Sequence, residues 1–125
     1  MEARKIIITG GATRIGAAIA EKLSGPNKEI TIHYNQSKSK AEKLKKKLQK
    51  FGTIVHLVKG DLSKERDIHK IVKFSKSKMK FFDCLINNAS LFENDKLENF
   101  SSSSWEKHIS TNLKAPALLS KEFSK

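Results

Sequence analysis

The amino-acid sequence predicts an α/β fold in which helices cover a parallel β-sheet. Two observations carry this prediction: short apolar segments alternate four times with longer segments of helical periodicity, and the first apolar segment runs straight into a glycine-rich turn. Strands that alternate with helices pair in parallel through right-handed crossovers. No internal repeat, low-complexity segment or linker interrupts the pattern, so residues 1–125 are predicted to form a single domain.

The first half of the chain supplies two strands and two helices. The run KIII and its flanks predict a buried strand over 4–9, and the Ala-rich segment that follows predicts a helix over 14–24, ended by a Gly-Pro pair. A second strand is predicted over 29–34. Residues 39–51 then form an amphipathic helix with an alanine and two leucines on one face.

The second half repeats the alternation twice. Ser63 is a suitable cap for the third helix, and Ser103 or Ser104 for the last one, in which Pro116 introduces a kink or marks the register. The expected elements are a strand over 53–59, a helix over 63–79, a strand over 82–87 and a final helix from the serine cap to residue 123.

The composition describes a polar globular protein, with 38% hydrophobic and 30% charged residues and a formal net charge of +12. Lysine supplies almost all of the positive charge, since arginine occurs only at Arg4, Arg14 and Arg66. Proteins that read nucleic acids rely on arginine forks and aromatic stacking. We therefore interpret the lysines as solvated helix faces and disfavour nucleic acid as a partner, although such a field attracts phosphate-bearing ligands.

Three observations bear on location. No apolar run approaches the roughly 20 residues of a membrane span. Residues 1–5 lead straight into the first strand, so no secretory segment is expected. Cys84 is the only cysteine, which fits a reducing compartment. We expect a cytoplasmic protein without a membrane association.

The segment TGGATRIG, residues 9–16, lies between the first strand and the first helix. Glycines let a backbone turn tightly and approach a pyrophosphate, whose charge the N-terminus of a helix stabilises. A P-loop does not fit, because Ala17 and Ala18 stand where it needs Lys and Ser or Thr, and the spacing Gly-x-Gly-x-x-Gly is absent. A purely structural turn is the alternative.

Five motifs, in order, resemble the short-chain dehydrogenase/reductase family over essentially the whole chain. The glycine turn is similar to the family's Thr-Gly-x3-Gly-x-Gly, with Arg14 in place of the middle glycine, as in the pteridine reductase branch. The resemblance implies a Rossmann-like, doubly wound parallel sheet, truncated after about four strands in the order 3-2-1-4. The other four motifs are HYNQS (33–37), GDLS (60–63), NNAS (87–90) and NLKAP (112–116).

The strand-end motifs share one rim, because ligands of an open parallel sheet bind beyond the carboxyl ends of its strands. An NAD site places an acidic residue about 20 residues past the glycine turn, to hold the ribose 2′-hydroxyl. This chain has YNQSK there (34–38) and no acid before Glu42. Arg14, Ser37 and Lys38 are suited to accept a 2′-phosphate, which predicts NADP(H) as the cofactor.

The resemblance also implies roles for individual residues. Asp61 bonds the adenine, and Ser90 lies near the nicotinamide and the substrate. Phe92 stacks on a pterin, with core packing as its alternative. Asn112 helps a proton relay, with the capping of a bend as its alternative. No metal site is expected. The residues implied to bind the cofactor are Thr9, Gly10, Arg14, Ile15, Gly16, His33, Tyr34, Asn35, Ser37, Asp61, Leu62, Asn88, Ala89 and Ser90.

The family's proton donor is a Tyr with a Lys four residues later on one helix face, and this pair follows a fifth strand. This sequence shows neither a fifth strand nor a Tyr-Lys pair on a helix after it. Tyr34 and Lys38 have the spacing, but they fall at the end of the second strand, on the adenosine side, so we reject them as a catalytic pair. We expect the NADPH-binding half of a reductase of small C=N or C=O substrates, pterin-like by resemblance, that lacks turnover alone.

Two other functions stay open at this point. One is a truncated, non-catalytic module that binds NADPH or a partner chain, and the other, which we favour less, is a basic nucleic-acid binder. The strand over 82–87 is expected to be an unpaired edge. Such an edge invites a second copy of the chain or a complementing chain.

Overall fold

The computed structural model describes residues 4–125, so residues 1–3, which enter the expectation about a secretory segment, lie outside the described part. Four parallel strands form one sheet in the order β3-β2-β1-β4, which confirms the predicted order. The strands are β1 (Lys5–Ile8), β2 (Glu29–Tyr34), β3 (Ile54–Lys59) and β4 (Cys84–Ile86).

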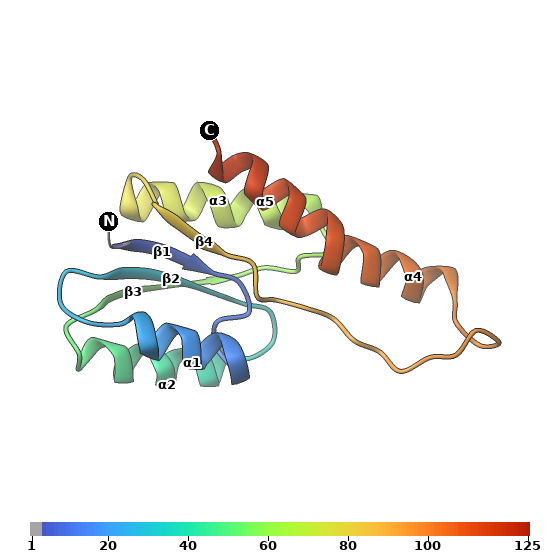
Figure 1. Ribbon diagram of the computed structural model, residues 1–125, viewed down its shortest axis with the longest axis horizontal. Coiled ribbons are helices and arrows are strands. Elements are labelled where there is room, and N and C mark those ends of the chain that lie inside the picture. The colour runs from blue at the N-terminus through green and yellow to red at the C-terminus, as the bar shows by residue number, and fades with distance from the viewer. Residues whose placement is uncertain (1–3) are drawn as a thin grey trace.

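Helices cover both faces of the sheet, as a doubly wound fold requires (Figure 1). The helices α1 (Arg14–Leu23) and α2 (Lys38–Gln49) lie on one face. The helices α3 (Glu65–Met79) and α5 (Ala115–Phe123) lie on the other. A fifth helix, α4 (Ser102–Ile109), extends beyond the sheet.

The central strands β1 and β2 are mostly buried because helices cover both faces of the sheet. Ile6 and Ile8 of β1 pack with Ile30 and Ile32 of β2 in the core beneath α1 and α2. A second core forms on the opposite face from the apolar stripes of α3 and α5, including Ile71. This packing holds the strands rigidly, so their ends can position a site.

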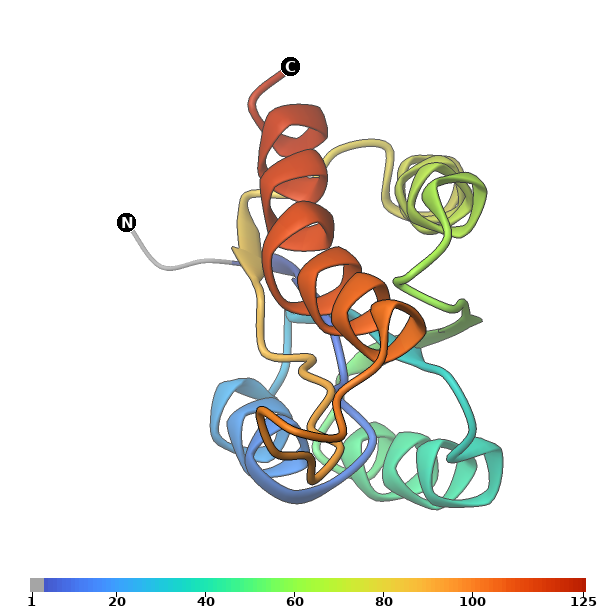
Figure 2. The same ribbon diagram turned by 90° about the vertical axis from the view of Figure 1, so that its right-hand side faces the viewer.

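The strand register brings the carboxyl ends together at one rim. Ile8 of β1 lies beside Ile32 of β2 and Ile86 of β4. Beyond the strands, the amide of Gly11 donates to the carbonyl of His33 at 3.1 Å and so continues the ladder into the glycine turn. Figure 2 views the molecule from this rim. The segment between β4 and α4, residues 87–101, which we call the arch, lies in front.

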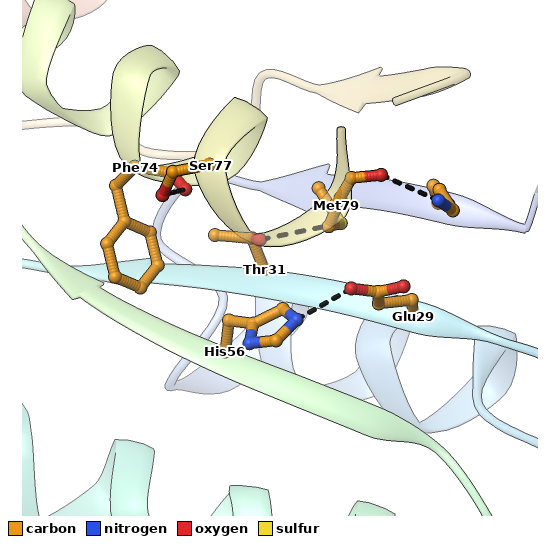
Figure 3. A network of polar contacts seen from close by, with 7 residues as sticks. Glu29, Thr31, His56, Phe74, Ser77 and Met79 are labelled. Carbon is orange, nitrogen blue, oxygen red and sulfur yellow. Dashed lines mark hydrogen bonds and ion pairs between the residues drawn. The ribbon is translucent and has the colours of Figure 1, made fainter. Parts of the chain in front are cut away.

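A separate set of polar contacts ties α3 to the sheet (Figure 3). The Nζ of Lys5 donates to the carbonyl of Met79 at 2.6 Å, and the hydroxyl of Thr31 lies 3.6 Å from the sulfur of Met79. On the neighbouring strands, Nε2 of His56 lies 2.7 Å from Oε2 of Glu29. All four sheet residues lie in the first half of their strands, so these contacts support the fold and are remote from the rim.

The helix caps differ from the sequence prediction. The hydroxyl of Ser101, not of Ser103 or Ser104, caps α4 and accepts from the amide of Ser104 at 3.0 Å. The helix α3 begins two residues later than predicted, because Ser63 bonds backward to Asp61. Serine runs contain several possible caps, and tertiary contacts select among them.

The last helix is interrupted rather than kinked at its proline. A π-helical turn over Ser110–Lys114 joins α4 to α5, and Pro116 stands in the first turn of α5. Proline has no amide to donate to the carbonyl of Asn112 four residues earlier, which loosens the α-helical ladder there. The π-helical turn therefore follows from Pro116.

The surface retains exposed apolar elements. In the described residues β4 pairs only with β1, which leaves it at the edge of the sheet as expected. Trp105 and Leu113, in the segment that follows β4, are 57% and 65% exposed. Residues 4–125 include no helix with the length and apolarity needed to cross a bilayer.

Candidate functional site

A groove of about 720 Å³ opens at the rim where the strands end. It is formed by the glycine turn, the ends of β2, β3 and β4, and the first turns of α1 and α2. The predicted cofactor-binding residues that line it are Gly10, Arg14, Ile15, His33, Tyr34, Asn35, Ser37, Asp61, Leu62, Asn88, Ala89 and Ser90. Thr9 and Gly16 lie buried behind its wall.

The glycine turn presents the start of α1 to the groove, whereas the amides of its two leading glycines already have acceptors within the fold. The amides of Gly10 and Gly11 donate to Nδ1 and to the carbonyl of His33, at 3.0 and 3.1 Å. In the described chain, no acceptor pairs with the first-turn amides at 14–16. Free amides and the helix dipole together favour a bound anion. A phosphate here would meet the start of α1 rather than the glycine amides.

Arg14 is the first residue of α1 and has a φ of +50°. An L-residue in this left-handed region is strained by about 1–2 kcal/mol. Glycine, which the resembled family pattern has at this position, adopts this conformation without strain. The exposed side chain of Arg14 lines the groove. Arginine thus adds a fixed positive charge at a position that disfavours any side chain.

His33 connects three of the segments that build the groove. Because its Nδ1 accepts from Gly10, its Nε2 carries the proton and donates to the carbonyl of Gly60 at 2.8 Å. Burial lowers the pKa of His33, and this effect outweighs the Gly60 carbonyl, Asp61 and Asp67, which raise it. A neutral, 3% exposed His33 therefore positions the glycine turn against β2 and β3.

Asp61 supplies a negative charge beyond β3. Its Oδ1 accepts from the amide and hydroxyl of Ser63, at 2.9 and 2.7 Å. Burial would raise the pKa of Asp61, but these hydrogen bonds and the charges of Lys64 and Lys107 hold it below its usual value. An ionised carboxylate accepts hydrogen bonds only, so it suits an exocyclic amine.

Thr9 and Asn88 join β1 to the segment after β4. The hydroxyl oxygen of Thr9 accepts from the amides of Asn88 and Ala89, both at 3.1 Å. The side-chain amide of Asn88 donates to the carbonyls of Thr9 and Gly10, also at 3.1 Å. Gly16 lies against this amide, and a Cβ there would come within 2.6 Å of its nitrogen. Thr9, Asn88 and Gly16 therefore set the shape of the wall.

The structure adds several residues that sequence reasoning missed. Lys40 lines the groove, whereas Lys38, suggested for the 2′-phosphate, does not. Lys107 and Thr111 approach from α4 and the π-helical turn, four residues apart on one helical face. Their spacing was visible in the sequence, but only the direction in which α4 extends brings them to the rim.

A second, mostly apolar pocket of about 510 Å³ lies beside the groove, between the arch and α4. Phe92 lines it and is 84% exposed, so core packing of this residue is wrong. Asn112 lies in the π-helical turn, where its side-chain amide exchanges two 2.8 Å hydrogen bonds with the backbone of Leu91. Phe92 therefore lines the pocket, and Asn112 holds the neighbouring residue Leu91, which lines the groove.

Tyr34 ends β2 and Lys38 begins α2, so the two residues do not share a helix face. The structure agrees with the rejection of this pair. A four-stranded parallel sheet in the order 3-2-1-4, with its groove beyond the strand ends, defines a Rossmann-like nucleotide-binding fold.

The chain belongs to the short chain dehydrogenase family, which matches residues 4–125. The Short-chain dehydrogenase/reductase FrzI of a Cladobotryum species is 30% identical over 113 residues, which are 90% of this chain and 44% of that protein.

Solved structures agree with this assignment. FolM alternative dihydrofolate reductase 1 from Brucella canis, complexed with NADP, is 32% identical with a TM-score of 0.85, over 94% of this chain and 48% of that one. A short chain dehydrogenase from Burkholderia cenocepacia J2315, in complex with NADP, shares the fold with a TM-score of 0.92 at 22% identity, over 97% of this chain and 49% of that one. The present chain thus spans about half the length of the relatives it matches.

Proposed function

We propose that this chain is the NADP(H)-binding half of a cytoplasmic short-chain oxidoreductase that resembles the pteridine reductases. The complete enzyme would transfer hydride from NADPH to a C=N or C=O bond of a small, pterin-like substrate. The observation that carries the proposal is the groove itself, which Arg14, Ser37 and Lys40 line together with the start of α1, where the amides are free. The FolM relative, complexed with NADP, adds support.

Different groove residues would bind chemically different parts of the cofactor. The first-turn amides of α1 would hold the pyrophosphate, and Arg14, Ser37 and Lys40 would hold the 2′-phosphate by charge-assisted hydrogen bonds. Asp61 would accept from the adenine amine. The segment 88–90 would line the nicotinamide end, where NADPH supplies the hydride.

Reduction of the substrate bond also needs a proton donor. No pair of groove residues has the Tyr-x3-Lys arrangement that the family uses for this purpose. We therefore propose that residues outside this chain complete the active site, and that the 125-residue chain alone binds the cofactor without turnover. Titration with 2′,5′-ADP tests binding, and NADPH oxidation with dihydrobiopterin tests turnover. Absence of binding contradicts the cofactor assignment, and clear oxidation by this chain contradicts the division of the site. Binding without oxidation would also fit a non-catalytic NADPH-binding module.

A second candidate function, polyanion binding, is favoured by one observation. Residues 38–80 carry fifteen Lys and Arg against four Asp and Glu, while the rest of the chain carries ten against nine. The lysine-rich helices α2 and α3 contact the edge strand β3 from opposite faces of the sheet (Figure 2). Lysines beside an edge strand also discourage strand pairing. Salt-dependent DNA binding that NADPH competes poorly would favour this function.

A further inference from the structure

The segment after β4 forms a wall shared by two hollows. Leu91 faces the groove, Phe92 lines the apolar pocket, and Glu93 lines both. Phe92 is 84% exposed, so packing holds its ring only weakly. The position of the ring therefore depends on the backbone on either side of it.

That backbone is anchored on both sides of Phe92 by one helical face. Asn112 exchanges two hydrogen bonds with the backbone of Leu91, and Nε2 of His108 accepts from the amide of Glu93 at 3.0 Å. The spacings match, because four helical residues rise about 6 Å and two extended residues span about 6.6 Å. The anchors therefore hold Phe92 between two fixed points.

The hydrogen bonds of His108 determine which of its nitrogens accepts. Its Nδ1 lies 2.7 Å from the carbonyl of Ser104, which only accepts, so the ring proton is on Nδ1. Nε2 is left with a lone pair directed at the amide of Glu93. Protonation of Nε2 would remove this acceptor and release the bond.

We infer that His108 is a positioning residue that holds Phe92 at the boundary between groove and pocket, and that protonation of His108 releases this anchor. The role of Phe92 at the substrate rests on the proposed function, whereas the anchor itself does not. The charged groups that share the pocket with His108 are Glu93, Asp95 and Lys96, and Lys107 precedes it on α4.

Hydrogen exchange of two backbone amides tests the anchor without any ligand. We expect His108→Met, which keeps the length of the side chain but removes the acceptor, to speed exchange at Glu93 about tenfold. His108→Gln places an oxygen near the site of Nε2 and should restore protection. The amide of Leu91, held by Asn112, is the internal control and should not change.

The pH dependence of exchange at Glu93 provides a second measurement. A histidine that only filled space would not give such a dependence. As the pH is lowered, the protection of the Glu93 amide, corrected for intrinsic exchange, should decrease in the native chain and stay constant in His108→Gln. Equal exchange at Glu93 in His108→Met and the native chain overturns the inference. Equal acceleration at Leu91 also overturns it, because the segment would then open as one unit.

Ligand binding tests what the anchor does. Affinity for NADPH should be unchanged in His108→Met, while dihydrobiopterin binding to the NADPH complex should weaken about tenfold. Unchanged dihydrobiopterin affinity would overturn the positioning of Phe92. Failure of the native chain to bind NADPH would instead contradict the proposed function, and the exchange measurements would still decide on the anchor.

Discussion

Arg14 allows backbone strain and phosphate recognition to be measured at the same position. Two substitutions, Arg14→Ala and Arg14→Gly, both remove the guanidinium, but only glycine accepts a φ of +50° without strain. At an ordinary exposed helix position, alanine is more stable than glycine by about 1 kcal/mol. Ala18, exposed on the same helix, provides that comparison through Ala18→Gly.

The expected magnitude follows from the conformation. Relief of left-handed strain contributes about 1–2 kcal/mol in favour of glycine at position 14. This offsets or exceeds the helix-propensity penalty of about 1 kcal/mol. We therefore expect urea unfolding to show Arg14→Gly as stable as Arg14→Ala or up to about 1 kcal/mol more stable. Ala18→Gly should lose about 1 kcal/mol. A loss of that size at position 14 as well would refute the strain.

Binding separates the charge from the backbone. A hydrogen bond to a charged group contributes about 1.5–3 kcal/mol, so either variant of Arg14 should bind 2′,5′-ADP about 10- to 150-fold more weakly. Calorimetric titration measures this loss, and ADP, which lacks the 2′-phosphate, is the matched ligand that should lose little. If both variants bind 2′,5′-ADP like the native chain, Arg14 does not recognise the 2′-phosphate.

Three further predictions concern the frame of the groove, each measured by urea unfolding. Gly16→Ala should cost about 2 kcal/mol or more, because the new Cβ meets the carbonyl of Gly10, whereas Gly60→Ala meets only a side-chain tip at 3.0 Å and should cost less; equal costs would contradict this. Thr9→Val should lower the free energy of unfolding by about 2 kcal/mol or more, because two amides lose their acceptor, and Thr9→Ser should retain most of the stability. A Thr9→Val variant as stable as Thr9→Ser would show that the hydroxyl is dispensable. Because burial lowers the pKa of His33, its contribution to stability should be complete above about pH 6.5. As the pH falls from there to the lowered native pKa, the free energy of unfolding should decrease by up to about 1.4 kcal/mol per pH unit. His33→Asn should flatten this slope, and an unchanged slope in that variant would show that another group causes the pH dependence.

Local sequence predicted the elements because their signals are short-range. The apolar runs that became β1 and β2 and the periodic segment that became α3 are visible without any partner. The helix caps were less predictable. Four consecutive serines can each cap α4, and the structure selects Ser101 through the geometry of the arch.

The candidate site divides in the same way. Strand-end motifs placed Asp61 and Asn88 at the rim, since parallel strands end on one side of a sheet. The motifs did not reveal that His33 takes up the amides of the two glycines, or that Lys40 replaces Lys38 at the groove. Side-chain direction decides these points, and the sequence does not encode it locally.

The sequence alone determined the alternation of strands and helices and the glycine turn, because these depend on periodicity and on residue types within a few positions. The order of the sheet was implied only by the resemblance to the short-chain dehydrogenase/reductase family. Tertiary structure alone decided which amides remain free, which lysine reaches the groove and that His108 and Asn112 hold Phe92 between them. Those contacts join residues from different elements, and their distances exist only after both cores have packed.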